Sequence, residues 1–404
     1  MKISIKERWS FKRLLLGTTL IAFTILSCKK SAPIQKVELS NNIKLKNSTS
    51  VLAYNTPIKL FDGGSGDYHS YRIPSLIRTK NGTLIAICEG RADNNKDFGN
   101  INVVCRRSTN NGASWGAEIV IQGASLGTWG NPTAVVDQDS GTIYVLMSWN
   151  AAGYSQFGDD GTTKITEPGQ RRVYYTKSTQ AQDGTVWSSP VNITSTATPT
   201  NKVWDAVGPG IGIQKRFGAT AGRLIIPAIG RNIYSDDGTN WYYTSLPGGT
   251  SEGTIVERLN GRLMRNDRAV SSNEKYRYKS VENTNGTWPA FVPVSGLPDP
   301  HCQGSILRYT DSPSRILLMN SASQTTRTAM RIRISNDEGA FWPTSKAIPQ
   351  HGTGNGKMGG YSSLAKSADN MIAALIEYNE NTTSSSTSHR SIYFYKFNLA
   401  WINQ

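Results

Sequence analysis

The most informative part of the chain is Ser335-Asn336-Asp337-Glu338-Gly339-Ala340-Phe341-Trp342, because its Ser-x-Asp-x-Gly-x-x-Trp pattern recurs at other positions. The copies are separated by roughly fifty to seventy residues. In such a stretch, short Ser and Asp side chains bind the backbone amides of their own turn, Gly adopts the left-handed conformation, and Trp packs the turn onto a sheet. The pattern therefore predicts a repeated hairpin turn with a structural role.

Four other copies vary in completeness. The copy at 108–115 has Asn110 in the Asp place, and the copy at 234–241 has Tyr234 in the Ser place and Asp236 in the Asp place. The two degenerate copies keep only the Gly-x-x-Trp end, at 183–187 and 285–288. Five copies of one turn indicate a repeat protein.

Composition and apolar runs predict that the repeats are all-β. Only 18% of the 404 residues are charged, and the chain holds 38 Gly, 17 Tyr and 10 Trp. About fifty-five residues per repeat over some 350 residues predicts a six-bladed β-propeller of four-stranded antiparallel blades. The strand near Ile392 could close the ring by pairing with the strand near Ile58. Strand-length apolar runs, most of them after a turn that contains Gly, occur at 83–88, 142–149, 223–227, 316–319 and 392–397.

The N-terminus has the features of an export signal. Five basic residues precede an apolar run at 14–26, which is too short to span a bilayer comfortably. The run ends in Ile25-Leu26-Ser27-Cys28, which resembles the lipobox of bacterial lipoproteins. We therefore divide the chain into a lipoprotein-type signal peptide (1–28), a flexible tether (29–55) and the propeller (56–404). We expect an exported periplasmic or cell-surface protein anchored through Cys28. A free secreted product is the alternative, because Leu26 is not the usual small residue.

Charge and cysteine content exclude several classes of function. The formal net charge is +15, of which the signal segment supplies about +4. The sequence has no basic run beyond Lys29-Lys30 and no helix suited to a nucleic-acid groove, so we expect no nucleic-acid partner. An acidic substrate or an anionic surface suits the positive excess. The cysteines that follow the signal are odd in number and widely spaced, which argues against a disulfide scaffold or a zinc site, so we expect buried small apolar side chains at Cys88, Cys105 and Cys302.

One tetrapeptide, Tyr71-Arg72-Ile73-Pro74, does not suit a purely structural strand. Pro removes a ladder donor, and an inward-facing Arg needs an anionic partner. With this signature and the turn repeats, the chain resembles the sialidases (neuraminidases) from about Pro57 to Trp401. Further matching motifs are Cys88-Glu89-Gly90-Arg91, Gly130-Asn131-Pro132-Thr133, Val207-Gly208-Pro209-Gly210, Asp299-Pro300-His301-Cys302-Gln303-Gly304-Ser305 and Leu399-Ala400-Trp401. The resemblance implies a six-bladed propeller with a central active site.

The resemblance also implies three arginines that bind the carboxylate of a sialic acid. Arg72 lies in the Arg-Ile-Pro signature, Arg268 ends a Leu-Met-x-Asn-x-Arg motif, and Arg327 precedes the strand that leads into the last turn copy. Guanidinium groups hold a planar carboxylate bidentately and remain charged at every working pH. A solvated surface role is the alternative for any one arginine of a basic protein.

Substrate charge bears on the nucleophile that the resemblance implies. The reacting carbon of a sialic acid carries a carboxylate, which would repel an attacking Asp or Glu, whereas a neutral phenol avoids this repulsion. Sialidases with a tyrosine nucleophile are recognised exceptions to the paired-carboxylate rule. Tyr361 matches the family's nucleophile, and Glu252 matches the glutamate that takes its proton. A phenol that titrates near 10 needs such a base.

The remaining site residues follow from the same resemblance. The acid that protonates the departing oxygen is a carboxyl on the loop after Arg91, either Asp97, which we choose, or Asp93. Glu377 matches a carboxylate that steadies the first arginine. Three more residues match family positions that line the sugar pocket, namely Arg91, Asn131 and Gln303. The alternative for each is a structural hydrogen-bonding role.

The sequence therefore predicts a retaining exo-α-sialidase that acts on sialylated glycans. We expect no metal, no cofactor and a monomer. One alternative is an enzyme that transfers sialic acid or forms an anhydro product. Others are a propeller that binds sialoglycans without cleaving them and a purely structural cell-surface repeat protein.

Overall fold

The computed structural model describes residues 53–123, 127–351, 357–380 and 389–404, which form an all-β structure. Helices in these ranges are limited to two four-residue segments, α1 (Thr194–Ala197) and α2 (Leu399–Ile402). None of the described helices has the length and apolar character to cross a membrane. The predicted signal peptide (1–28), its Cys28 and most of the predicted tether (29–55) lie outside the described residues.

The first and last described strands share one four-stranded sheet, in the order β1-β27-β26-β25. Strand β1 pairs antiparallel with β27, where Ile58 lies opposite Phe394 and Phe61 lies opposite Ile392. This pairing confirms the contact predicted between the two ends of the domain. The four strands are β1 (Ile58–Phe61), β25 (Lys357–Lys366), β26 (Ile372–Asn379) and β27 (His389–Phe397).

Three further sheets are four-stranded and antiparallel, and their strands are paired in sequence order. The first contains β13 (Ile213–Gln214), β14 (Leu224–Ala228), β15 (Arg231–Ser235) and β16 (Tyr242–Ser245). The second contains β17 (Thr250–Glu257), β18 (Leu263–Ala269), β19 (Tyr276–Val281) and β20 (Val292–Pro298). The third contains β21 (Ser305–Thr310), β22 (Arg315–Ser321), β23 (Met330–Ser335) and β24 (Thr344–Ala347).

Nine of the remaining strands form one sheet, in the order β11-β10-β7-β6-β4-β3-β2, with β5 paired to β4 and β12 paired to β6. Strands β4 and β6 join in parallel through the pair Ile101 and Thr128. A separate small sheet holds β8 (Tyr154–Ser155) and β9 (Thr163–Lys164). The nine strands are β2 (Ser70–Arg78), β3 (Leu84–Arg91), β4 (Ile101–Ser108), β5 (Ile119–Gln122), β6 (Gly127–Val136), β7 (Ile143–Ala151), β10 (Arg172–Ser178), β11 (Val191–Asn192) and β12 (Gly210–Ile211).

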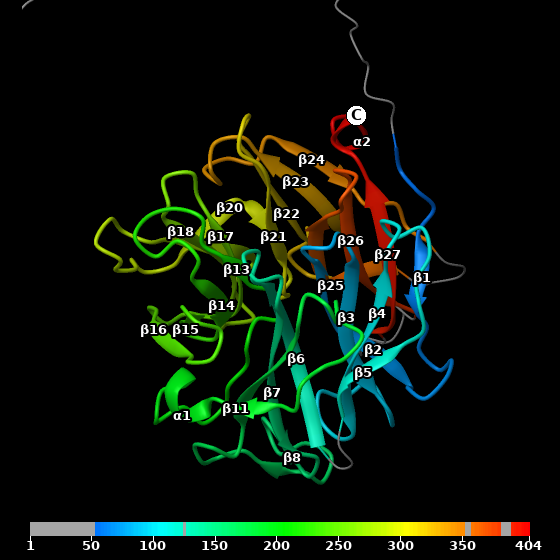
Figure 1. Ribbon diagram of the computed structural model, residues 1–404, viewed down its shortest axis with the longest axis vertical. Coiled ribbons are helices and arrows are strands. Elements are labelled where there is room, and N and C mark those ends of the chain that lie inside the picture. The colour runs from blue at the N-terminus through cyan, green and yellow to red at the C-terminus, as the bar shows by residue number, and fades with distance from the viewer. Residues whose placement is uncertain (1–52, 124–126, 352–356, 381–388) are drawn as a thin grey trace, which may run out of the picture. The chain divides into compact units, whose positions relative to one another are not determined.

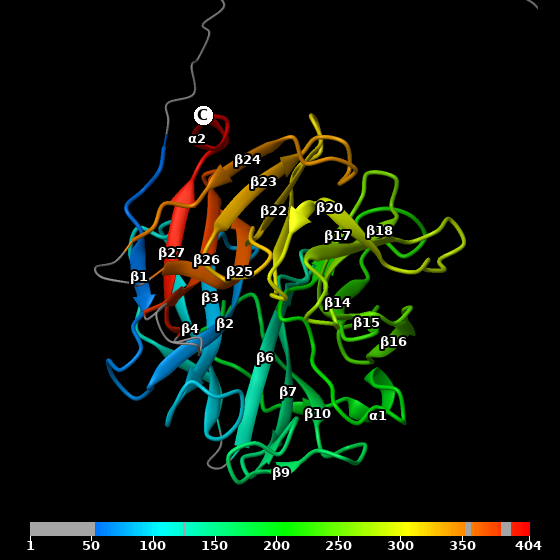
Figure 2. The ribbon, with the colours of Figure 1, turned by 180° about the vertical axis from the view of Figure 1, so that it is seen from behind.

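Six strands contact one another in a cyclic order. Strand β2 contacts β6, β6 contacts β14, β14 contacts β17, β17 contacts β21, β21 contacts β25, and β25 contacts β2. Figures 1 and 2 show the larger sheets arranged around these six inner strands. Residues from distant parts of the chain are therefore brought together by the inner strands.

The most complete copy of the recurring turn has the hydrogen bonds that the sequence predicted. In the 335–342 turn, Asp337 Oδ1 accepts from the amides of Ala340 (3.1 Å) and Phe341 (3.0 Å). Ser335 Oγ accepts from the amide of Gly339 (2.8 Å), whose φ of 82° lies in the left-handed region. The five copies connect β4 to β5, β10 to β11, β15 to β16, β19 to β20 and β23 to β24.

In the 234–241 turn, the residues predicted for the Ser and Asp places are wrong. Ser235, not Tyr234, accepts from the amide of Gly238 (2.9 Å), and Asp237, not Asp236, accepts from two following amides (2.8 and 2.7 Å). Asp236 instead pairs with Arg223 at 2.7 Å. The assignment was wrong by one position because this turn has one residue fewer between its Ser and its Gly.

The tryptophans of the turns pack into the core. Each of the five indoles belongs to, or packs against, a different hydrophobic cluster. These tryptophans are Trp115, Trp187, Trp241, Trp288 and Trp342. Each turn thus fastens two strands to the interior. The three cysteines of the described chain are free and buried, which confirms the prediction for Cys88, Cys105 and Cys302.

Candidate active site

Register irregularities interrupt five of the six inner strands. Four of them include a candidate site residue, and the fifth lies between Arg308 and Thr310 of β21. Left-handed residues lie at three of these bulges, namely Ile73 (φ 62°), Asn131 (φ 56°) and Gly360 (φ 120°). A bulge bends a strand and turns its side chains toward a new direction. The bulge in β2 also explains how Pro74 fits there, since the ladder is already interrupted. The four register shifts at the candidate site lie in β2, β6, β17 and β25, between Arg72 and Ser75, Gly130 and Thr133, Thr250 and Gly253, and Met358 and Ser362.

Three side chains from three strands meet through short hydrogen bonds. Tyr361 lies in the bulge of β25, Glu252 in the bulge of β17, and Arg268 near the end of β18. The Tyr361 hydroxyl donates to Glu252 Oε1 at 2.5 Å. Arg268 Nη1 donates to Glu252 Oε2 at 2.7 Å and to the Tyr361 hydroxyl oxygen at 2.9 Å. The phenol therefore has both an acceptor for its proton and a cation beside its oxygen.

The environment keeps the Tyr361 phenol protonated in the absence of a ligand. Burial raises its pKa well above the usual value, and the nearby charge of Glu252 raises it further. Arg268 and Arg327 oppose this rise without overcoming it. The phenol can act as a nucleophile only when a base removes its proton as the new bond forms.

The other two predicted arginines lie beside the ring of the same tyrosine. The guanidinium carbon of Arg72 is 5.4 Å from the centre of the Tyr361 ring, and that of Arg327 is 5.7 Å away. Arg327 precedes β23 and donates from Nη2 to the main-chain oxygen of His301 at 3.0 Å. The structure thus brings together around one phenol the three arginines chosen from the sequence.

Glu377, on β26, is fully buried and fixes two of these groups. Its Oε1 accepts from Arg72 Nε (3.0 Å) and the Ile73 amide (2.9 Å), and its Oε2 accepts from Arg72 Nη2 (3.1 Å) and the Tyr361 amide (2.9 Å). Burial acts to raise the carboxyl pKa of Glu377, but the charge of Arg72 and these hydrogen bonds lower it to about 2. A permanently ionised carboxylate thus orients Arg72 and the bulge that carries Tyr361.

Asp97 lies on the loop between β3 and β4, with a side chain that is 77% exposed. Its Oδ1 is 2.8 Å from Arg91 Nη2 and 3.8 Å from Arg72 Nη1. The charge of Arg91, and then that of Arg72, lowers the pKa of the Asp97 carboxyl below its usual value. Of the two acids considered on this loop, Asp97 is the one that reaches the arginines.

The three predicted pocket residues are engaged with the protein itself. Arg91 is 2% exposed and donates to Glu89 Oε2 from Nε (2.9 Å) and Nη2 (2.6 Å). Gln303 is also buried, and its amide bonds the main chain of Pro209 and Ser362. Asn131 is half-buried, and its Oδ1 accepts from Arg171 Nη2 at 2.9 Å. Gln303 thus has the contacts of a structural residue, whereas Asn131 is only half-buried.

Two residues in the site were not singled out by the sequence analysis. Glu89 is buried, and its Oε1 accepts from the amide of Asn131 at 2.8 Å, so one carboxylate holds both Arg91 and the bulge of β6. His301 contacts both Arg268 and Arg327. Both residues lie inside motifs quoted for the resemblance, so the motifs located them without indicating their contacts. Among the described residues, no cluster of three or more His, Cys, Asp or Glu side chains could hold a metal ion.

Comparisons with known proteins agree on one family. Residues 82–373 match the model of the BNR repeat-like domain. The chain is 45% identical over 358 residues to an exo-alpha-sialidase of Aspergillus fumigatus, covering 83% of this chain and 85% of the relative. It is 43% identical over 373 residues to an exo-alpha-sialidase of Arthroderma benhamiae, covering 86% and 87%. Among solved structures, a Hadza microbial sialidase superposes with a TM-score of 0.72 at 23% identity, over 86% of this chain and 69% of that one.

The fold and these relatives define a glycoside hydrolase built on a β-propeller-like fold. The chain belongs to the sialidase family.

Proposed function

We propose that this protein is a retaining exo-α-sialidase that removes terminal sialic acids from glycoconjugates through a tyrosyl-linked intermediate. The observation that carries the proposal is the 2.5 Å hydrogen bond between Tyr361 and Glu252, with Arg268 bonded to both and two more arginines beside the ring. The relatives named exo-alpha-sialidase support the same reaction.

The arginines supply the binding part of the mechanism. Arg72, Arg268 and Arg327 bind the carboxylate of the sugar, and the planar forks fix its orientation better than an ammonium group could. Arg72 enters this role already oriented by Glu377. Holding the carboxylate places the anomeric carbon, to which it is attached, within reach of the Tyr361 oxygen.

The first chemical step breaks the glycosidic bond. Glu252 takes the phenolic proton while the Tyr361 oxygen bonds to the anomeric carbon, and Arg268 stabilises the negative charge that develops on the oxygen. Asp97 gives its proton to the departing glycosidic oxygen, which leaves as an alcohol. In the second step Asp97 removes a proton from water, the water oxygen bonds to the anomeric carbon, and Tyr361 leaves and recovers its proton from Glu252. Two inversions at one carbon give overall retention.

The acid role of Asp97 requires a change in its pKa on binding. Without substrate, Arg72 and Arg91 hold that pKa below its usual value, so the carboxyl is ionised at neutral pH. A bound carboxylate offsets the charge of Arg72, and the bound sugar removes water from the exposed Asp97 side chain. Both effects raise the pKa of Asp97 and favour the protonated acid. Substrate binding therefore prepares the acid for its step.

The architecture proposed for this site is a six-bladed propeller. The nine-stranded sheet divides at the single pair between β4 and β6. One part contains β2, β3, β4 and β5, and the other contains β6, β7, β10 and β11, with the short strand β12 added to β6. Together with the four four-stranded sheets this gives six units, and each unit contributes one strand to the cyclic order of contacts. In five of these units, the turn between the third and fourth strands is then an Asp-box repeat.

We further propose that residues 1–28 direct export and that Cys28 receives the lipid anchor, with 29–55 as the tether. The two fungal relatives do not share the bacterial source that the lipobox suggests. Expression in a bacterial host with a Cys28→Ala variant tests the anchor. The native chain should fractionate with membranes and the variant should not, and equal distribution of the two would contradict the proposal.

The test of the function is the release of a fluorogenic phenol from its α-sialoside by the purified protein. We expect turnover by the native protein, loss of turnover in the Tyr361→Phe variant, and the α-anomer of sialic acid as the first product by proton NMR. The same spectra separate hydrolysis from transfer or anhydro formation. Binding of the sialoside without turnover by the native protein would contradict the proposal.

A further inference from the structure

His301 connects two of the three arginines that surround Tyr361. It lies between β20 and β21 with a left-handed backbone (φ 60°). Its side-chain Nδ1 is 3.0 Å from Arg268 Nη2, and its main-chain oxygen accepts from Arg327 Nη2 at 3.0 Å. One residue thus contacts a guanidinium group from β18 and another from the segment before β23.

The hydrogen bonds fix which ring nitrogen of His301 carries the proton. An arginine can only donate, so Nδ1 must be an acceptor toward Arg268. The other ring nitrogen, Nε2, is 3.1 Å from the main-chain oxygen of Val270, which can only accept, so Nε2 carries the hydrogen. The imidazole is therefore neutral, and its two partners select one tautomer.

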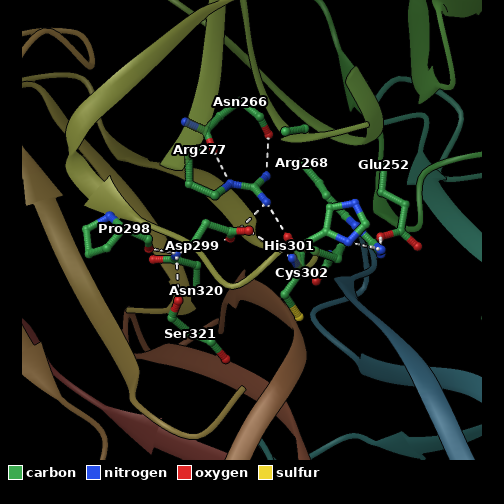
Figure 3. Close-up of polar contacts among 12 residues, drawn as sticks. Glu252, Asn266, Arg268, Arg277, Pro298, Asp299, His301, Cys302, Asn320 and Ser321 are labelled. Atoms are coloured by element: carbon green, nitrogen blue, oxygen red, sulfur yellow. Dashed lines mark hydrogen bonds and ion pairs between the residues drawn. The ribbon is translucent and has the colours of Figure 1, made fainter. Parts of the chain in front are cut away.

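A buried ion pair holds the turn that carries His301. Arg277 and Asp299 are 0% and 1% exposed, and they pair at 3.3 Å. Asp299 Oδ1 accepts from the amide of Cys302 (2.8 Å), while Arg277 Nη1 donates to the Cys302 carbonyl (2.5 Å). Arg277 also bonds Asn266, two residues before Arg268 on β18 (Figure 3). The turn and the strand that carry the two partners are thus fixed relative to each other.

We propose that His301 is a positioning residue of the carboxylate site, whose neutral imidazole holds Arg268 in the orientation that serves both substrate and nucleophile. By accepting from Nη2, it leaves Nη1 of Arg268 to bond Tyr361 and Glu252. By accepting from Arg327 through its carbonyl, it sets the separation of the two guanidinium groups. This inference rests on the proposed function, because it assigns a role in binding the sialic acid carboxylate.

The alternative arrangement shows why an acceptor is needed at this place. Without the imidazole, Nη2 of Arg268 loses its partner, and the guanidinium can turn to pair with both oxygens of Glu252. That pairing would occupy the base and move the cation away from the carboxylate of the substrate. Burial and then the charge of Arg268 lower the pKa of His301, with Arg327 acting in the same direction and Glu252 opposing it. The imidazole therefore stays neutral, and so an acceptor, over the working pH range.

The test compares His301→Ala, which removes the acceptor, with His301→Asn, which offers a side-chain oxygen near the place of Nδ1 and tolerates the left-handed backbone. His351→Ala is the matched control, because the imidazole of His351 also makes one side-chain hydrogen bond, to Tyr54, outside the site. For an aryl sialoside we expect His301→Ala to raise KM about ten-fold or more and to lower kcat, since the lost bond involves a charged group. His301→Asn should stay within about three-fold of the native kcat/KM, and His351→Ala should match the native protein.

The outcomes separate this inference from the proposed function. A native protein that hydrolyses the sialoside, together with a folded His301→Ala variant of native KM and kcat, would overturn the role of His301 and leave the function standing. An Asn variant as impaired as the Ala variant would also overturn it, because an acceptor alone would not restore activity. A native protein without turnover would overturn both. If His301→Ala does not fold, a His301→Leu variant that folds and keeps native kinetics would serve as the same contradiction.

Discussion

Replacing Glu377 with Gln should reduce both stability and activity, because one carboxylate holds Arg72, the Ile73 amide and the Tyr361 amide. Each carboxylate oxygen accepts from two donors, one on Arg72 and one on the main chain. The amide group of Gln must therefore direct its own hydrogens at two donors, whichever way it is placed. The variant also leaves Arg72 buried without its counter-charge.

The size of the stability change follows from that geometry. Breaking a buried ion pair by removing one partner costs about 3–5 kcal/mol. With an unfolding entropy of about 2.1 cal/mol/K per residue over roughly 350 residues, Tm should fall by about 4–7 °C. Loss of the fixed Arg72 orientation should lower kcat/KM about 100-fold, as expected when a binding group moves by about 1 Å.

The assay combines thermal unfolding with hydrolysis of an aryl sialoside well below Tm. Glu257→Gln is the matched control, because Glu257 is a buried carboxylate that accepts from the amides of Arg216 (2.7 Å) and Phe217 (3.1 Å) and lies 3.6 Å from Lys215. The control should lose stability and keep its kcat/KM. A Glu377→Gln variant that is folded and retains native kcat/KM would show that Glu377 does not orient Arg72 for binding.

Three further predictions test other parts of the structure. Asp97→Asn should lower kcat/KM by about 10²–10⁴-fold for an alkyl sialoside and much less for a nitrophenyl sialoside, whose leaving group needs little protonation, and equal losses for the two substrates would exclude an acid role. Burial lowers the pKa of His389 to about 4. The free energy of unfolding should therefore fall by about 3 kcal/mol as the pH drops from 6.5 through 4, because the unfolded chain binds the proton more readily. Unfolding of a His389→Gln variant should depend less steeply on pH over that range. Asp337→Ala removes the acceptor of two turn amides and should cost about 1–2 kcal/mol in denaturant titrations with unchanged kcat/KM; a loss of activity in the folded variant would contradict a purely structural turn.

Local chemistry explains which features could be predicted from the sequence. The turn at 335–342 depends on residues within one turn, and its Ser and Asp contacts were predicted correctly. Arg72 and Pro74 are unsuited to a purely structural strand, and the structure has a bulge there. The same reasoning misplaced Ser235 and Asp237 by one residue, because loop length changes the register without altering the residue types.

Contacts between distant segments explain what the sequence analysis missed. Glu89 meets the Asn131 amide across 42 positions, and His301 meets Arg268 across 33. Nothing local distinguishes these residues from structural polar groups in a strand or turn. The approach of β2, β6, β17 and β25 also depends on the cyclic order of contacts, which no short motif encodes.

Mass spectrometry can locate the covalent bond to the sugar and so identify the nucleophile. Protein quenched with acid during turnover of an aryl sialoside should carry one sialyl group, and fragmentation of its peptides by mass spectrometry should place that group on Tyr361. The Glu252→Gln variant should form the adduct more slowly at the same residue. A sialyl group on Asp97 or Glu252 would contradict the account.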